Sequence, residues 1–133
     1  MVAVDTNVVV RLLTGDEPTQ EAVARALFAT GPIWIAKTVL LEAGWVLTRV
    51  YGFTQEAVVE AFTKLLGLQN VHVEDEPAII ASLKLAANGI DLADAIHLNS
   101  TPSGTDFVSF DKPFVKRALQ AGAIRISNLP GQK

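Results

Sequence analysis

Short apolar runs typical of β-strands alternate with longer helical runs along the whole chain, and this alternation constrains the fold more than any other feature. The strand candidates are Val2–Val4, Ile33–Ile35, Val71–Val73, Asp106–Phe110 and Ile124–Ile126. Strands that alternate with helices are joined by right-handed βαβ crossovers, which produce a parallel sheet covered by helices. We therefore predict an α/β protein in which helices sandwich a parallel sheet.

Helical patterns fill the intervals between these strands, and turn or capping residues mark where each helix starts or stops. The expected helices run to about Leu13, from Thr19 to Thr30, from Thr38 to Tyr51, onward from Thr54, up to Asn88, from Asp91 to near Pro102, and from Asp111 to Ala121. In parallel sheets of this kind, reactive groups collect beyond the carboxyl ends of the strands. Polar residues that directly follow a strand are therefore the first candidates for a functional site.

The composition is that of one folded domain over residues 1–133. Half of the residues are hydrophobic and 19% are charged, which supplies a core and leaves little sequence for disorder. The absence of cysteine excludes disulfides and thiolate zinc sites. No uncharged apolar run is long enough to cross a membrane, and Asp5 interrupts the apolar start of the chain, which argues against a signal peptide. We expect a cytoplasmic protein with no membrane partner.

The net charge is −3, from 11 basic and 14 acidic residues. This balance argues against a protein that holds nucleic acid on a broad basic face, because such binding needs clustered cations. It does not exclude an enzyme that acts on nucleic acid, since acids gathered in one pocket would account for the excess and bound cations would reverse the local sign.

Two aspartates directly follow predicted strands. Asp5 ends the first apolar run, and Asp111 ends the run Phe107–Phe110 with Pro113 in the next helical turn. Each has a structural explanation, because aspartate is a favoured N-cap residue. Each also stands where a central strand would deliver a carboxylate to the rim of the sheet.

Two further acids lie in helical sequence. Glu42 is the one acid of an apolar segment that we expect to be buried, and no basic residue lies three or four positions away to neutralise it. A buried unpaired carboxylate costs several kcal/mol, so a metal, or water ordered by a metal, would explain it. Hydrogen bonds to distant backbone are the structural alternative. Asp94 has apolar neighbours, whereas Asp91 is the natural cap of the same helix.

Four carboxylates in one pocket would repel each other unless cations or protons compensated them. Oxygen ligands without cysteine, and with only two scattered histidines, suit Mg²⁺ or Mn²⁺ better than zinc. The matching chemistry is the hydrolysis of phosphodiester bonds, in which such cations activate water and stabilise charge on the reacting oxygens.

These motifs resemble those of the PIN-domain nucleases, and most closely the VapC-type toxins of bacterial toxin–antitoxin pairs. The matching segments are Val4–Asn7, Leu41–Ala43, Asp94–Leu98 and Ser109–Phe114, in the order of the family and over essentially the whole chain. The resemblance implies a five-stranded, mainly parallel sheet in an α/β/α sandwich. It also implies a homodimer and an antitoxin partner whose tail blocks the active site.

The family's acidic quartet corresponds to Asp5, Glu42, Asp94 and Asp111, which the resemblance implies to be catalytic. Asp5 and Asp94 would bind Mg²⁺ or Mn²⁺ directly, whereas Glu42 and Asp111 would bind directly, act through water or position the nucleophile. The substrate would be RNA, commonly tRNA or ribosomal RNA, cut endonucleolytically. The hydroxyl or amide groups of Thr6, Asn7 and Ser109 would orient the carboxylates, or would serve local turns.

Other functions remain open. A haloacid-dehalogenase-type phosphatase would need a second acid where this chain has Asn7. The main alternative is a catalytically weak binding module that docks an antitoxin and co-represses its operon, with apolar residues such as Trp34, Trp45 and Tyr51 as its surface. Those side chains are more often part of a core. No DNA-reading helix is evident, so DNA would be contacted only through the antitoxin.

Overall fold

Three short strands form a parallel sheet at the amino-terminal end of the molecule. In the computed structural model, which describes residues 1–131, β1 (Val2–Ala3) pairs with β2 (Ile33–Ile35), and β2 pairs with β3 (Val71–Val73). Both pairings are parallel, as the alternation of strands and helices predicts. Both isoleucines of the central strand β2, Ile33 and Ile35, are fully buried.

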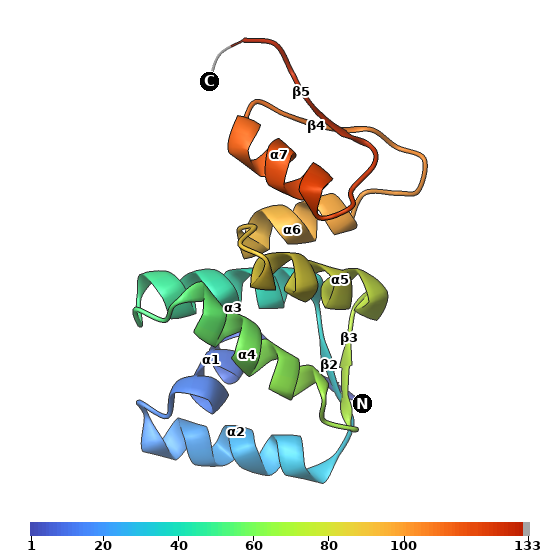
Figure 1. Cartoon of the computed structure of the whole chain (residues 1–133). Helices are drawn as coiled ribbons and strands as arrows, with labels where there is room; N and C mark the ends of the chain where they lie inside the picture. Colours follow the sequence, from blue (N-terminus) through green and yellow to red (C-terminus); the bar gives the residue numbers. More distant parts are fainter. Residues whose placement is uncertain (132–133) are drawn as a thin grey trace.

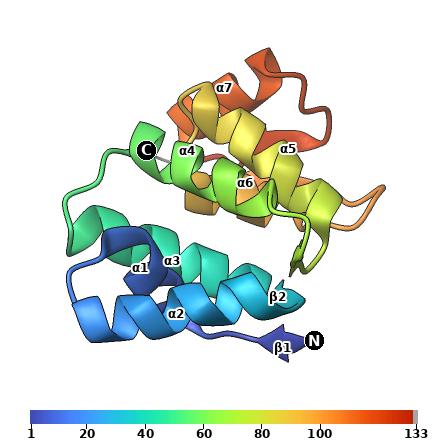
Figure 2. The same ribbon diagram turned by 90° about the horizontal axis from the view of Figure 1, so that it is seen from below.

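In the described part of the chain, seven helices connect and cover the strands (Figures 1 and 2). They are α1 (Thr6–Thr14), α2 (Pro18–Thr30), α3 (Lys37–Arg49), α4 (Gln55–Leu66), α5 (Glu76–Ala87), α6 (Leu92–Asn99) and α7 (Lys112–Gln120). Local signals fix several ends: the Thr54 side chain caps α4 by accepting from the Ala57 amide, and Gly15 ends α1 in the left-handed conformation. The predicted helices are confirmed, although α6 ends earlier than Pro102 because Ser100 already leaves the helix.

The main core lies between the three-stranded sheet and the helices α1 to α5. Its fully buried side chains come from α1, α3, α4, α5 and the sheet, and include Val9, Leu40, Phe62, Ile79 and Ile33. This core fixes the positions of β1 and α3 relative to each other, and these two elements carry Asp5 and Glu42.

The carboxyl-terminal part forms a second, smaller unit. Strand β4 (Phe107–Ser109) pairs in parallel with β5 (Ile126–Asn128), and α7 connects the two strands. In Figure 1 this orange and red unit lies beyond α5 and α6, on the side away from β1, β2 and β3. Residues Phe114, Val115, Ala118 and Ile126 pack there on Ile90 and Ala95 in a buried cluster of their own.

The predicted five-stranded sheet is therefore not formed among residues 1–131. The sheets have three and two strands, in the orders β1–β2–β3 and β4–β5. The physical reason is that the second unit buries its apolar residues against α5 and α6 instead of placing β4 beside β1. The last strand also starts two residues later than predicted, since Ile126 is buried whereas Ile124 is 87% exposed.

Within residues 1–131, none of the helices combines the length and the apolar character that a membrane crossing requires.

Candidate active site

Asp5 lies at the junction between β1 and α1. Its side chain caps α1, because Asp5 Oδ1 accepts a hydrogen bond of 3.2 Å from the Val8 amide. The carboxylate is exposed at the carboxyl end of the strand. The capping role and the position at the rim of the sheet are therefore both present, and one carboxylate oxygen is left free of the cap.

Glu42 is held close to this junction by Thr6. The Thr6 hydroxyl donates a hydrogen bond of 2.6 Å to Glu42 Oε1, across 36 positions of sequence. A hydrogen bond to a charged acceptor at this distance is short and strong compared with neutral ones. The residue next to Asp5 thus orients the carboxylate of α3, and two of the four predicted acids lie at one end of the sheet.

The prediction that Glu42 is buried is wrong. Helix α3 buries Leu40, Ala43, Gly44 and Leu47, but its opposite face is exposed and carries Glu42, Trp45 and Arg49. The sequence indicates a helix that is apolar all round because Trp45 counts as apolar, although its side chain is 57% exposed. An exposed carboxylate needs no buried partner, so the energetic argument for a metal at Glu42 does not hold within the single chain.

Asp94 lies in the first turn of α6, whose cap is Asp91. The Asp91 carboxylate accepts a hydrogen bond of 3.2 Å from the Asp94 amide, which confirms the capping role of Asp91. The Asp94 side chain is partly buried, and this desolvation raises its pKa. The negative charges of Asp91 and then Asp111 raise the pKa further, while His97 lowers it. Asp94 and Asp111 are thus near enough for their charges to interact.

Asp111 occupies the same position in the second unit that Asp5 occupies in the first. It follows β4 and caps α7, because its Oδ1 accepts a hydrogen bond of 3.1 Å from the Phe114 amide. The Ser109 hydroxyl accepts from the Asp111 amide at 3.0 Å, which is the local turn bond that we considered for this residue. Each unit therefore presents one aspartate at the carboxyl end of a strand.

The four acids form two groups in the single chain. Asp5 and Glu42 are linked through Thr6, whereas Asp94 and Asp111 interact through their charges. Among residues 1–131, no three histidine, aspartate or glutamate side chains gather closely enough to hold a metal ion. The oxygen-rich donor set suits a hard cation, but the placement of the two groups does not form a centre for one within one chain.

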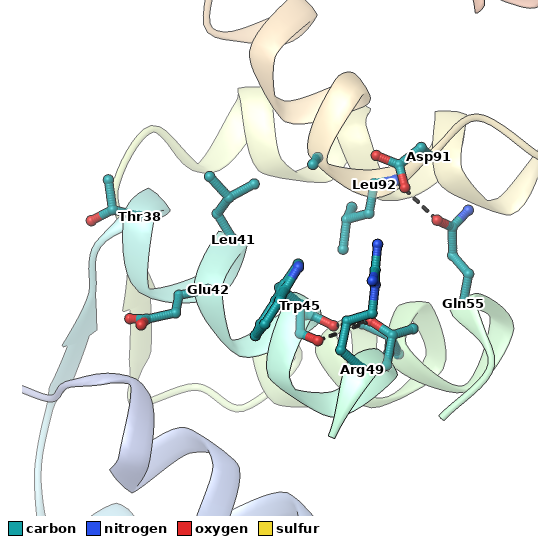
Figure 3. A pocket seen from close by; sticks show the side chains of 12 residues that line it. Thr38, Leu41, Glu42, Trp45, Arg49, Gln55, Asp91 and Leu92 are labelled. Carbon is teal, nitrogen blue, oxygen red and sulfur yellow. Dashed lines mark hydrogen bonds between the residues drawn. The ribbon is translucent and has the colours of Figure 1, made fainter. Parts of the chain in front are cut away.

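A cavity of about 660 Å³ opens beside Glu42, between α3, α4 and the start of α6. Figure 3 shows the carboxylates of Glu42 and Asp91 at opposite ends of the view, with Trp45 and Arg49 between them. The guanidinium of Arg49 lies 5.9 Å from the Trp45 ring centroid, within the range of a cation–π contact. Sequence reasoning missed Arg49, although its spacing of seven from Glu42 places both residues on one face of α3.

Gln55 fixes the far wall of this cavity. Its amide group donates to the carbonyls of Ala86 and Ile90, and its carbonyl accepts from the Leu92 amide at 3.0 Å. These three bonds tie the start of α4 to the end of α5, to the turn that follows it and to the start of α6. They therefore hold the segment that carries Asp91 and Asp94 against the main core, and no sequence pattern pointed to Gln55.

The protein belongs to the α/β class, with parallel strands and with acids at the carboxyl ends of two of these strands. The family comparison matches residues 2–119 to the PIN domain, and the chain belongs to that family. The family resemblance of the sequence motifs is thereby confirmed. No curated protein matches the chain.

Among solved structures, the chain is similar to the crystal structure of Mycobacterium tuberculosis VapC20, a toxin that cleaves the sarcin–ricin loop. The two chains share 20% sequence identity over 94% of this chain and 98% of the other, with a TM-score of 0.45.

Proposed function

We propose that this protein is a Mg²⁺- or Mn²⁺-dependent endoribonuclease that uses Asp5, Glu42, Asp94 and Asp111. Membership of the PIN domain family supports this proposal, together with the presence of all four acids of the quartet. The observation that carries it is the bond from Thr6 to Glu42, because it fixes two carboxylates from distant segments at one strand end.

The second group of acids supports the same proposal through its electrostatics. The pKa of Asp94 is raised by desolvation and by the charges of Asp91 and Asp111. Titratable groups with such perturbations are enriched in functional sites, because the protein spends stability to hold like charges together. A bound cation would relieve this repulsion and favour the ionised form of Asp94.

The residues of the chain would share the work as follows. Asp5 and Asp94 would hold the cation, and Thr6 keeps Glu42 in a fixed orientation from which it would position water or phosphate. Asp111, at the end of β4, would bind the cation directly or through water, or would position the nucleophile. A divalent cation, once bound, supplies an activated water and stabilises charge on the phosphate oxygens.

The substrate that we propose is RNA, with tRNA or ribosomal RNA as the first candidates. We further propose that the protein is the toxin of a toxin–antitoxin pair, acts in the cytoplasm as a homodimer over the single domain 1–133, and contacts DNA only through its antitoxin. The alternative is a binding module with weak catalysis, and the division of the acids into two groups within one chain favours it.

Cleavage of RNA by the purified protein tests the proposal. End-sequencing of total RNA should reveal discrete new ends with Mg²⁺ or Mn²⁺, which disappear with chelator and in the Asp5→Asn variant. Glu60→Gln on α4 is the matched control, because it also replaces an exposed acid by its amide but lies outside the quartet. Absence of cleavage from the wild type in every metal would favour the binding module, whereas cleavage that persists in Asp5→Asn would contradict the catalytic role of Asp5.

A further inference from the structure

The exposed face of helix α3 carries an aromatic ring next to one acid of the quartet. Glu42, Trp45 and Arg49 follow one another at spacings of three and four residues, and all three side chains are exposed. Residues at these spacings lie on one face of a helix, in successive turns. Of the two tryptophans in the chain, Trp45 is the exposed one, with 57% of its surface accessible, whereas Trp34 is half-buried. The indole ring is therefore available to a ligand beside Glu42.

The cavity beside Glu42 has the size and the lining of a small-molecule site. Its volume of about 660 Å³ lies within the range of such sites. Its walls include the apolar side chains of Leu41 and Leu92. Among residues 1–131, the charged side chains that line it are Glu42, Arg49 and Asp91. An apolar wall with a few placed polar groups is the form that ligand sites commonly take.

The two charged groups at the end away from Glu42 have bonding capacity to spare. Arg49 forms no salt bridge with any carboxylate of residues 1–131, and its guanidinium lies 5.9 Å from the Trp45 ring centroid. The Asp91 carboxylate accepts from the Asp94 amide through Oδ2, and an ionised carboxylate can accept further bonds on both of its oxygens. In Figure 3 the Arg49 side chain extends from α3 toward the start of α6, where Asp91 lies.

This combination of groups matches the edge of a guanine base. Guanine carries an acceptor oxygen, O6, next to two nitrogen donors, N1–H and N2–H. A carboxylate can accept from both donors at once, and a guanidinium donates to O6 and N7. An exposed aromatic ring stacks on the face of an unpaired base. Adenine has an amino donor in the place of O6, so its amino group would oppose the donors of Arg49.

We propose that this cavity binds an unpaired guanine of single-stranded RNA, with the base stacked on Trp45 and its edge bonded to Arg49 and Asp91. These three residues then determine specificity and are distinct from the quartet. The base and the phosphate lie at opposite ends of a nucleotide, and Asp91 and Glu42 lie at opposite ends of the view in Figure 3. The phosphate therefore points toward Glu42, and the bond that is cut adjoins the guanosine. This last statement rests on the proposed function, whereas the binding of guanine does not.

The character of the cavity favours a base over a protein segment. Trp45 is the one large hydrophobic residue of the lining, within residues 1–131, whose side chain is exposed. A single ring suffices for a flat base, whereas a protein interface needs a larger apolar patch. An apolar segment would also bury the charges of Arg49 and Asp91 without partners, at a large cost in free energy. Recognition through the base suits a chain of net charge −3, because it depends less on neutralising phosphates.

Tryptophan fluorescence tests the stacking. The Trp34→Phe variant leaves Trp45 as the only tryptophan of the chain. The probes are a uridine RNA hexamer and its versions with one guanosine or one adenosine at the third position. Ca²⁺ replaces Mg²⁺ as the oxygen-binding cation, and electrophoresis checks that the RNA stays intact. We expect the guanosine hexamer to quench the Trp45 emission and to bind at least about 10-fold more tightly than the adenosine hexamer.

Substitutions at the edge of the base test the preference for guanine. Asp91→Asn keeps a good cap of α6 but cannot accept from both guanine donors, so the ratio of the dissociation constants for adenosine and guanosine hexamers should fall to near unity. Arg49→Gln should also lower this ratio. A general change in charge affects both hexamers alike and leaves the ratio unchanged. The controls Glu60→Gln and Lys84→Gln replace exposed charges outside the cavity and should keep the ratio of the wild type.

Substitutions of the ring test its role separately. Trp45→Ala should weaken the binding of every hexamer roughly 10-fold, because stacking accepts any base. Trp45→Phe keeps an aromatic ring and should retain most of the affinity. Leu119→Ala removes an exposed apolar side chain of α7 outside the cavity, and should bind as the wild type does.

Four results would overturn the guanine site. The first is equal binding of the guanosine and adenosine hexamers by the wild type, or no binding of either. The second is a Trp45 emission that a saturating concentration of RNA leaves unchanged. The third is an unchanged ratio of dissociation constants in Asp91→Asn. The fourth is a Trp45 emission that shifts with protein concentration in the absence of RNA, since a second copy of the chain would then cover the ring.

Mapping of the cleaved ends separates this inference from the proposed function. With Mg²⁺ or Mn²⁺, the new RNA ends should adjoin guanosines in the wild type and lose this preference in Asp91→Asn. Guanine binding by a wild type that cleaves no RNA would reject the proposed function and leave the base site in place. Cleavage without a preference for guanosine would instead reject the base site beside the bond, and leave the proposed function in place.

Discussion

The Thr6 hydroxyl donates a hydrogen bond of 2.6 Å to the Glu42 carboxylate, and so joins the start of α1 to the middle of α3. The two residues are 36 positions apart, and the helices that carry them are fixed by the main core. The orientation of Glu42 therefore depends on a residue that lies next to Asp5 in the sequence.

Removal of this hydroxyl should reduce cleavage more than stability. We expect Thr6→Val to lower the cleavage rate roughly 10- to 100-fold, as losses of groups that orient active-site ligands do. The free energy of unfolding should fall by only about 1 kcal/mol, because the bond is exposed. Thr6→Ser keeps the hydroxyl and should retain most of the activity. Equal rates in the valine and serine variants would contradict this role.

The aspartates at the strand ends combine capping and chemistry, and different substitutions separate the two. Asp5→Asn keeps a good cap of α1 and should leave the free energy of unfolding nearly unchanged, whereas Asp5→Ala should cost about 1 kcal/mol. Both variants should lose cleavage. Denaturant unfolding and RNA cleavage measured on the same preparations check this, and an Asn variant as unstable as the Ala variant would argue against the cap.

Asp94 makes stability depend on pH. Its pKa is raised in the folded state by desolvation and by the charges of Asp91 and Asp111, so folding favours the protonated form. This contribution is present in acid and is lost as the pH rises through the raised pKa. We therefore expect metal-free Asp94→Asn to melt above the wild type at pH 7, with a difference that shrinks toward about pH 3. A lower melting temperature at pH 7 would contradict the crowding of these acids.

The two faces of α3 should respond differently to truncation. Leu47 is fully buried, and Leu47→Ala should destabilise the protein by about 2–5 kcal/mol. Trp45 is exposed and contacts Arg49 at 5.9 Å, so Trp45→Ala should cost less than about 1 kcal/mol. Chemical denaturation of both variants measures this. A similar loss of stability in the two variants would mean that Trp45 is part of a core or of a dimer interface.

The sequence was sufficient to predict the structure wherever local patterns determine it. The strands at Ile33–Ile35 and Val71–Val73 are found as predicted, since their apolar residues are flanked by turn signals. The capping roles of Thr54 and Asp91 are likewise local, because the side chain bonds to an amide three residues later. The order of the four acidic motifs led to the family that the comparison confirms.

The remaining features depend on long-range packing, which local patterns do not contain. The exposure of Glu42 follows from which side of α3 meets the core, and Trp45 concealed that side in the sequence. The separation of β4 from β1 follows from the contacts of Phe114 and Ile126 with residues of α6 and its preceding turn.

Binding of Mn²⁺ to the wild type and to variants from each acidic group tests the central claim most directly, because that claim is that both groups serve one centre. Calorimetric titration should show one class of binding that is weakened at least about 10-fold by Asp5→Asn and equally by Asp94→Asn, while Glu60→Gln binds as the wild type does. Undiminished Mn²⁺ binding after the loss of either aspartate would contradict a common site for the four carboxylates.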